Sequence, residues 1–237
     1  MTNSYNIHPI GIVHSPFKEK FGTPRQPGLV KAKCSIELLP PYNRMDALKG
    51  LEGFSHIWIH FIFHQAIREQ HSNSWQPTVR PPRLGGNEKV GVFASRSPFR
   101  PNNIGLSVAR LVKIEQSDSR LLLHVEGLDI VDGTPVIDIK PYIPYVDAIP
   151  DAFEGFATGA PEKKLSVTLS DEAENQLKAA ENPQELRQLI IEVLQTDPRP
   201  AYKSNEKEGE YGILLYEYNI RWRIVDNKAV VEVILKQ

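Results

Sequence analysis

Short runs in which apolar and polar residues alternate fill most of the first 145 residues of this chain. Such alternation puts successive side chains on opposite faces, which is typical of half-buried β-strands. Glycine and proline separate the runs, and few stretches have the spacing of an amphipathic helix. This pattern favours a closed or nearly closed antiparallel barrel. The expected strands are residues 7–13, 30–39, 54–64, 90–95, 105–115, 120–129 and 135–142. Asp132-Gly133 is expected to form a tight hairpin turn between the last two.

A different pattern follows a segment rich in proline, glycine, alanine and aromatic residues, 141–161, which we interpret as a linker. Ser170 precedes two acidic residues, a combination that marks the start of a helix. Asn182-Pro183 separates two expected helices, and a terminal hairpin is expected to turn at Asp226-Asn227. The ranges of these elements are 171–181 and 184–195 for the helices and 211–236 for the hairpin.

These patterns predict a mainly β protein with two domains. Residues 1–160 are expected to form an antiparallel β-barrel N-terminal domain, and residues 161–237 a small α+β C-terminal domain. A hydrophobic content of 41% is enough for each part to bury a core.

The charge balance is nearly neutral, with 28 lysine and arginine residues against 29 aspartate and glutamate residues. Binding of a polyanion would therefore depend on a local patch and not on bulk charge. The single cysteine, Cys34, argues against a disulfide framework and a cysteine-cluster metal site. The beginning of the chain lacks the apolar run of a signal peptide, and no segment has the roughly 20 apolar residues that span a bilayer. We expect a cytoplasmic protein without membrane contact.

The densest cluster of cations lies in residues 75–105, where five lysine and arginine residues accompany one acid, Glu88. Five prolines and a glycine pair prevent a long helix, so the cations are expected on stiff loops. Phe99 lies between Arg96 and Arg100, an arrangement that suits phosphate binding together with stacking on a base. The alternative is a solvated basic loop.

Two further groups of polar residues are candidates for chemistry. Four-residue spacing of His56, His60 and His64 would suit a metal site on a helix, but the alternating pattern predicts a strand, and no cysteine or carboxylate completes a ligand set. We expect no metal. Asp138 and Lys140 share one face of an expected strand with a tyrosine, as a pocket wall or as a solvated ion pair.

Several common nucleotide and hydrolase motifs are absent from the sequence. No two glycines are two positions apart, which excludes the dinucleotide fingerprint, and no nucleophile elbow or metalloprotease signature is present.

Five segments, in this order, closely resemble the TrmO family of tRNA methyltransferases (TsaA-like, YaeB-type). They are PRQPGLV (24–30), FSHIWIHFIFHQ (54–65), RPPRLGG (80–86), GVFASRSPFRPNNIG (91–105) and LDIVDGTPVIDIKPY (128–142). DPRPAY (197–202) and the strand around IRWRI resemble the extra domain of the bacterial enzymes. Asn103 departs from the pattern, because a relative can carry a second proline there.

The resemblance implies a β-barrel enzyme that acts as a homodimer and uses S-adenosyl-L-methionine. The implied reaction methylates N6 of N6-threonylcarbamoyladenosine beside the anticodon of tRNA. The implied cofactor contacts are Gln26, Pro27, Gly28, His64, Gln65, Arg96, Val108, Leu128, Asp129, Ile130 and Val131. The expected contacts to the tRNA anticodon loop are Arg80, Arg83, Phe99 and Arg100.

Two catalytic roles follow as hypotheses from this reaction. Asp138 is expected to accept the N6 proton, and Lys140 or Arg100 to hold the threonyl carboxylate. The second domain is expected to extend the grip on tRNA or to brace the barrel. Its candidates for that grip are Arg199, Lys203, Arg221, Trp222 and Arg223.

Two other classes of function stay open from the sequence. One is a non-catalytic RNA-binding β-barrel module, which would bind RNA without S-adenosylmethionine. The other is a small-molecule hydrolase built on His64 and Asp138, for which the sequence offers no activated nucleophile.

Overall fold

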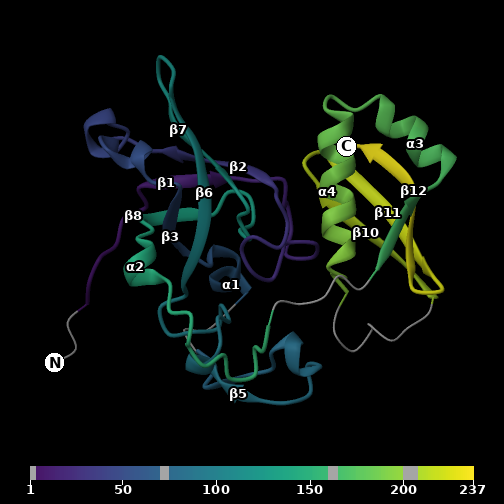
Figure 1. The fold of residues 1–237 in the computed structure, drawn as a ribbon, viewed down its shortest axis with the longest axis horizontal. Coiled ribbons are helices and arrows are strands. Elements are labelled where there is room, and N and C mark those ends of the chain that lie inside the picture. Colours follow the sequence, from purple (N-terminus) through teal and green to yellow (C-terminus); the bar gives the residue numbers. More distant parts are fainter. Residues whose placement is uncertain (1–3, 70–74, 160–164, 200–207) are drawn as a thin grey trace.

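A closed barrel of antiparallel strands forms the N-terminal part of the computed structural model (Figure 1). The structure describes residues 4–69, 75–159, 165–199 and 208–237, without the side chains of residues 67–69 and 83. Around the barrel the order is β1-β2-β7-β6-β3-β8. The bounds are Gly11–His14 (β1), Lys33–Leu38 (β2), His56–Ile62 (β3), Ile104–Gln116 (β6), Leu121–Glu126 (β7) and Pro135–Pro141 (β8). The expected mainly β barrel is thereby confirmed.

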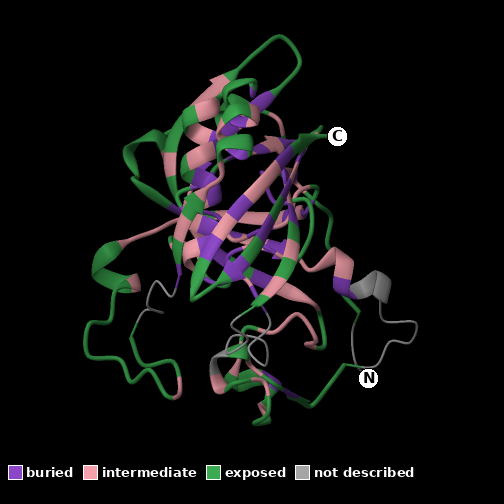
Figure 2. Ribbon diagram, turned by 90° about the vertical axis from the view of Figure 1, so that its right-hand side faces the viewer, coloured by how far each residue is buried: buried purple, intermediate pink, exposed green. Residues whose placement is uncertain are grey.

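The barrel closes because the inward positions of its strands are apolar. Along β3 the side chains of Ile57, Ile59 and Phe61 are buried, whereas the residues between them are not. Buried residues alternate with less buried ones in the same way on β2 and β7. Figure 2 colours the buried residues of the whole molecule purple. Gly105 pairs with Phe61, and a Cβ atom at this glycine would lie only 2.3 Å from the ring. The missing side chain therefore makes room for the ring in the core.

Two sequence-based expectations for this part are wrong. In place of a strand over 90–95, a two-residue strand β5 (Val90–Gly91) pairs with β4 (Thr78–Val79) and a 3-10 helix follows (Val92–Ala94). Asp132-Gly133 does not close a hairpin, because β7 pairs with β2 and β6 whereas β8 pairs with β1 and β3. The turn belongs to a connection across the end of the barrel.

The C-terminal part is a four-stranded sheet of order β10-β11-β12-β9, with two helices packed against it. The strands are Ser166–Leu169 (β9), Glu208–Leu215 (β10), Tyr218–Val225 (β11) and Lys228–Lys236 (β12), and the helices are Asp171–Lys178 (α3) and Pro183–Gln195 (α4). Ser170 caps α3 as expected, since its hydroxyl accepts a hydrogen bond of 3.1 Å from the Ala173 amide. The turn at Asp226-Asn227 is also confirmed, but the sheet has two more strands than the expected hairpin, because residues 208–225 form two strands and β9 pairs with β12.

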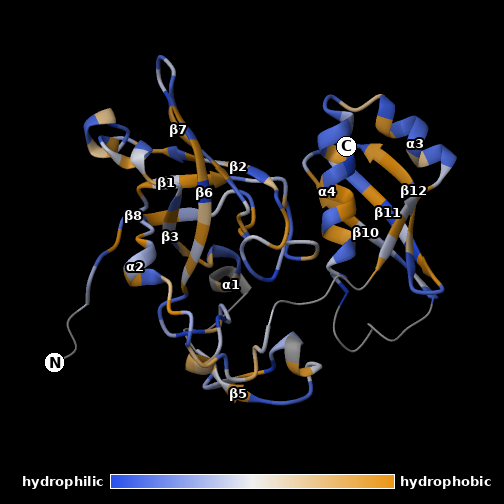
Figure 3. Cartoon of the chain, viewed as in Figure 1, coloured by the Kyte–Doolittle hydropathy of each residue, from blue (hydrophilic) through white to orange (hydrophobic). Residues whose placement is uncertain are grey.

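Hydrophobic residues concentrate in the strands of both sheets and on the inner side of α4 (Figure 3). Short helices complete the described chain: Met45–Leu48, Leu51–Gly53, His64–Glu69 (α1), Pro82–Leu84 and Pro144–Asp147 (α2). Among the residues that the structure describes, no helix has both the length and the apolar character needed to cross a membrane. The expected boundary between the domains, at residue 160, lies outside the described residues.

The two parts meet through the segment that connects β1 to β2. The backbone amide of Tyr216 donates to the carbonyl of Pro16 at 2.8 Å, and that of Lys31 donates to Glu192 on α4 at 2.6 Å. Lys33 forms an ion pair of 2.5 Å with Glu185, also on α4. The C-terminal part therefore braces one connection of the barrel.

Candidate functional site

A pocket of about 210 Å³ opens at the end of the barrel where β3 finishes. Its walls combine the end of β3, the β1–β2 connection and the segment between β7 and β8. The lining residues are Lys20, Thr23, Pro24, Phe61, Phe63, His64, Gln65, Ala66, Pro98, Asp129, Ile130, Val131 and Thr134. Five of the expected cofactor contacts are among them: His64, Gln65, Asp129, Ile130 and Val131.

The end of β3 presents His64 and Gln65 to this pocket. The backbone amide of Phe63 donates to the carbonyl of Asn103 at 2.8 Å, which ends the strand beside the neighbouring loop. Helix α1 then begins at His64. The rings of Phe61 and Phe63 meet edge to face at 4.9 Å and form an apolar wall.

The segment after β7 turns at Gly127, which has a positive φ of 86°. Its carbonyl accepts a hydrogen bond of 2.9 Å from the amide of Gly28, so the two glycine backbones lie close together. Leu128 is buried in the core, and the carbonyl of Ile130 accepts a hydrogen bond of 2.8 Å from Ser15. These contacts hold Asp129 at the pocket.

Asp129 is a carboxylic acid in a largely apolar pocket. Burial raises its pKa, while the Ser107 hydroxyl and the positive charge of Arg96 oppose the rise. Ser107 donates a hydrogen bond of 2.5 Å to Oδ1 of Asp129 and is itself buried. A partly buried carboxylate is favoured by donors or positive charge nearby, so the pocket suits a ligand that brings them.

Arg96 connects two of the loops around this carboxylate. Its Nη1 donates a hydrogen bond of 2.8 Å to Oε1 of Gln26, on the β1–β2 connection. Pro27 follows Gln26, and Gly28 is bonded to the segment that carries Asp129. The structure thus brings together the expected contacts at residues 26–28, 96 and 129.

The rest of the basic loop is only partly available to a ligand. Arg100 donates to the backbone carbonyls of Ser95 at 2.9 Å and Ser97 at 3.3 Å, so its guanidinium holds the loop together. Phe99 is half-buried and Arg80 is exposed. The side chain of Arg83 lies outside the described residues.

Asp138 and Lys140 lie on the outer face of the barrel. Asp138 pairs across strands with His60, and Lys140 with Trp58, whose side chains alternate with the buried residues of β3. The two form an ion pair and are both about half exposed. Val108 is also on this face, opposite Trp58. None of the three is among the residues that line the pocket.

The expected contribution of the C-terminal part to tRNA binding is wrong for two residues. Arg199 and Trp222 are each only 1% exposed, so neither can reach a bound RNA. Arg199 instead forms a buried ion pair of 2.8 Å with Asp197. Arg221 and Arg223 are exposed, and Lys203 lies outside the described residues.

The three histidines separate in the structure. His56 and His60 occupy outward positions of β3, whereas His64 lines the pocket. Over the described ranges, no group of three or more histidine, cysteine, aspartate or glutamate residues is arranged to hold a metal ion.

Sequence reasoning missed Ser107 and the two aromatic walls of the pocket. Ser107 is a polar residue at an inward position of β6, between the buried Gly105 and Ala109. A lone polar residue at an inward position of an apolar pattern is the signal that could have identified it, because buried hydroxyls require a partner.

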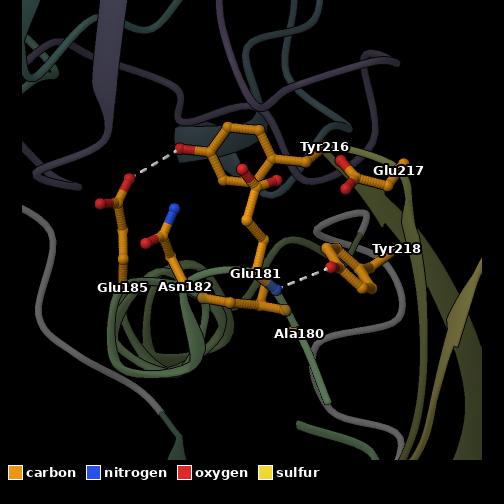
Figure 4. Close-up of a pocket in the computed structure, with 8 residues that line it drawn as sticks. Ala180, Glu181, Asn182, Glu185, Tyr216, Glu217 and Tyr218 are labelled. Carbon is orange, nitrogen blue, oxygen red and sulfur yellow. Dashed lines mark hydrogen bonds between the residues drawn. The ribbon is translucent and has the colours of Figure 1, made fainter. Parts of the chain in front are cut away.

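A second pocket, of about 160 Å³, lies between α4 and the β10–β11 turn (Figure 4). The Tyr216 hydroxyl donates to Glu185 at 3.1 Å, and the amide of Glu181 donates to the Tyr218 hydroxyl at 3.3 Å. Burial and the adjacent Glu185 carboxylate raise the pKa of Tyr216. Because Glu185 also pairs with Lys33 of the barrel, this pocket belongs to the junction of the two parts.

Comparisons with known proteins cover both parts of the chain. The family model of the tRNA-methyltransferase O N-terminal domain matches residues 12–148, and that of the TrmO C-terminal domain matches residues 162–237. The chain is 49% identical over 228 residues to the tRNA (adenine(37)-N6)-methyltransferase of Escherichia coli K12, covering 94% of this chain and 95% of that protein.

Two proteins of Pseudomonas aeruginosa extend the comparison. A putative S-adenosylmethionine-dependent methyltransferase, RcsF, is 45% identical, with 92% of each chain covered. A crystal structure of TrmO has a TM-score of 0.78 at 37% identity, covering 98% of this chain and 99% of that one. The similarity therefore includes the barrel, the C-terminal part and their order.

Proposed function

Because this chain belongs to the TrmO family of tRNA methyltransferases, we propose that it methylates N6 of adenosine 37 in tRNA with S-adenosylmethionine as donor. The observation that carries this proposal is a similarity that spans nearly the full length of the E. coli enzyme. The finer part of the proposal is that the adenosine carries an N6-threonylcarbamoyl group. It follows from the motif resemblance described above.

Groups in and beside the barrel-end pocket suit S-adenosylmethionine, which supports the proposal. Its apolar walls, Phe61 and Phe63, suit a flat purine, and the partly buried Asp129 carboxylate suits hydroxyl or amino donors. Arg96, at the side of Gln26, suits the carboxylate of the amino-acid end. When bound, the donor supplies a methyl group on a positively charged sulfur.

The chain must orient an acceptor that is a poor nucleophile. The lone pair of N6 in a carbamoylated adenine is delocalised, so alignment supplies much of the acceleration. We assign proton acceptance to Asp138 and binding of the threonyl carboxylate to Lys140. These two residues are ion-paired and accessible on the outer face of β8.

The outer face that carries this pair also exposes apolar side chains. Leu106 of β6 pairs with His60 of β3, which pairs with Asp138 of β8 on its other side, and Leu106 is 43% exposed. After β8, Tyr145, Ile149 and Phe153 are exposed by 89%, 65% and 104%. Exposed apolar groups of this kind mark interaction surfaces. We assign them to the interface of a homodimer, in which Asp138 and Lys140 serve the pocket of the other subunit.

The positions of Asp129 and Asp138 on different sides of the barrel wall support a site shared between two subunits. Asp129 lines the barrel-end pocket, whereas Asp138 points away from the core on the opposite side of the β8 backbone. A second subunit against the outer face gives Asp138 a pocket to act on. Since the proposed substrate is tRNA, the proposed location of the enzyme is the cytoplasm.

Mass analysis of tRNA nucleosides tests the function directly. Incubation of protein, S-adenosylmethionine and tRNA that contains N6-threonylcarbamoyladenosine is expected to convert this nucleoside to its N6-methylated form. A parallel incubation with unmodified tRNA tests whether the threonylcarbamoyl group is required. Calorimetry with S-adenosylmethionine provides the second measurement: RNA binding by a folded protein without cofactor binding would instead indicate a non-catalytic RNA-binding barrel.

A further inference from the structure

Trp75 and Phe93 form an exposed, stacked aromatic pair. Their ring centroids lie 6.2 Å apart with an interplanar angle of 24°. The two residues are 44% and 73% exposed. Large aromatic side chains normally gain stability by burial, so a stacked pair that stays exposed calls for a function.

A rigid frame presents this pair. In the pairing of β4 with β5, Thr78 lies opposite Gly91 and Val79 opposite Val90. Both strands are close in sequence to the two aromatic residues. The amide of Val92 donates to the carbonyl of Pro77 at 3.0 Å, and Val92 is only 1% exposed. The exposed rings therefore stand on an ordered, anchored unit.

The same unit is attached to the loop that borders the barrel-end pocket. The amide of Gln76 donates to the carbonyl of Phe99 at 3.2 Å. Phe99 lies between Pro98, which lines the pocket, and the loop-holding Arg100. Figure 1 shows the β5 region projecting beyond the end of the barrel, on the side of α1. The aromatic pair thus lies on a continuation of the pocket's border.

Charge identifies the kind of ligand that fits this surface. Arg80 and Lys89 lie between Trp75 and Phe93 in the sequence and are exposed, as is Arg96, three residues after Phe93. Glu88 is the one acid in residues 75–105. Stacked aromatic rings among cations match a single-stranded nucleic acid, whose bases stack on the rings while its phosphates pair with the cations.

We propose that Trp75 and Phe93 form a stacking platform for an unpaired base of the tRNA anticodon loop, beside the adenosine that is methylated. The inference rests on the proposed function, because it takes tRNA as the substrate. The platform holds the loop by a base that is not itself modified, while Arg80 and Lys89 contact the neighbouring phosphates. It accordingly contributes to RNA affinity and not to cofactor binding.

The experiment compares RNA binding by Trp75→Ala and Phe93→Ala with the wild type. Two probes are used: an anticodon stem-loop RNA, and the same RNA with abasic nucleotides in the loop. Each alanine variant is expected to weaken binding of the intact loop by roughly tenfold to a hundredfold. The abasic loop is expected to bind wild type and variants equally, since it has no base to stack. Trp75→Phe, which keeps a ring, is expected to retain most of the affinity.

Controls separate stacking from damage to the fold. Phe54→Ala removes an aromatic ring that is 38% exposed elsewhere on the barrel and is expected to leave RNA binding unchanged. Calorimetry with S-adenosylmethionine is expected to give wild-type affinity for each variant that folds. A Phe93→Leu variant, which keeps an apolar side chain, provides a second measurement if Phe93→Ala fails to fold.

Three results would overturn the platform. They are wild-type affinity of the alanine variants for the intact loop, an equal loss of affinity for the abasic loop, and a change of subunit association in place of RNA affinity. In each of these cases methylation of tRNA by the wild type would leave the proposed function intact. If the wild type itself neither binds S-adenosylmethionine nor methylates tRNA, the proposed function fails, whatever the variants do.

Discussion

Nη1 of Arg96 donates a 2.8 Å hydrogen bond to Oε1 of Gln26, a residue 70 positions earlier in the chain. The bond joins the β1–β2 connection to the loop before β6, and the Arg96 charge acts on the Asp129 carboxyl. One guanidinium therefore links three segments that the sequence keeps apart. Because Arg96 both bonds Gln26 and acts on the charge of Asp129, a change of charge at residue 96 should alter the site.

Replacement of Arg96 by glutamine is expected to raise the pKa of Asp129 further. The Arg96 charge favours the ionised carboxylate, so its loss leaves the effect of burial less opposed. Carbon NMR of the Asp129 carboxyl during a pH titration measures the change. Arg110→Gln, at an arginine paired with Glu126 on the barrel surface, provides the matched control. An unchanged titration of Asp129 in Arg96→Gln would contradict the proposed electrostatic contact.

Asp129→Asn is expected to separate stability from ligand binding. Because burial raises the pKa of Asp129, the folded protein binds this proton more tightly than the unfolded chain does. The free energy of unfolding therefore falls as the pH rises from the unfolded pKa through the folded one. Asparagine lacks this ionisation, so its stability relative to the wild type should increase over that window.

Urea unfolding of Asp129→Asn and wild type at several pH values measures this difference. At neutral pH the variant is expected to be at least as stable, while its affinity for S-adenosylmethionine falls about tenfold to a hundredfold, the usual range for a hydrogen bond to a charged group. A variant that loses stability relative to the wild type as the pH rises would show that the carboxylate is stabilised in the fold.

Mixed dimers test whether the proposed site is shared between subunits. At an S-adenosylmethionine concentration that saturates the wild type but lies well below the dissociation constant of Asp129→Asn, this variant and Asp138→Asn are each expected to have little activity alone. When equal amounts are mixed and subunits exchange, half of the dimers are mixed and carry one intact shared site, so about a quarter of wild-type activity should return. The assay is methylation of tRNA after exchange. No recovery in a sample shown to contain mixed dimers would place both residues in one subunit's site, whereas full activity of Asp138→Asn alone would exclude Asp138 from the site.

Arg25→Gln is expected to loosen the loop that carries Gln26. Nη2 of Arg25 donates to the carbonyl of Arg199 at 2.8 Å, which fastens this loop to the C-terminal part. Loss of such a bond costs about 1.5 to 3 kcal/mol locally. Hydrogen exchange should become faster in residues 22–28, with a lower kcat/KM. Arg187→Gln, at an arginine paired with Glu174 inside the C-terminal part, serves as the control and should leave this exchange unchanged.

The buried ion pair of Arg199 and Asp197 is expected to support the C-terminal part. Both side chains are almost fully buried, and the guanidinium also lies 6.0 Å from the centre of the Tyr211 ring. Arg199→Met leaves an unpaired buried carboxylate and should cost about 3 to 5 kcal/mol of unfolding free energy. Thermal unfolding measures the loss, and Arg221→Met, at an exposed arginine, should change it little. Equal stability of both variants would contradict a structural role of the pair.

The sequence by itself determined the strands of the barrel and several of their limits. Alternation along β3 identified its inward residues, Ile57, Ile59 and Phe61, because a strand exposes its two faces in turn. Local capping chemistry likewise identified the start of α3 at Ser170 and the turn at Asp226-Asn227. The motif resemblance added the family and the segments around the pocket, including Asp129 and His64.

Only the tertiary structure decided which of these residues meet. The partner of a strand depends on how the barrel closes, so Asp132-Gly133 was wrongly expected to join two adjacent strands. Burial of Arg199 and the hydrogen bond of Ser107 to Asp129 depend on contacts between distant segments. The alternation of apolar and polar residues within one segment does not predict such contacts. The side of β8 that carries Asp138 was readable from the sequence, but its distance from the pocket's lining was not. Periodicity reports the face of an element, and only packing of the whole chain decides what that face touches.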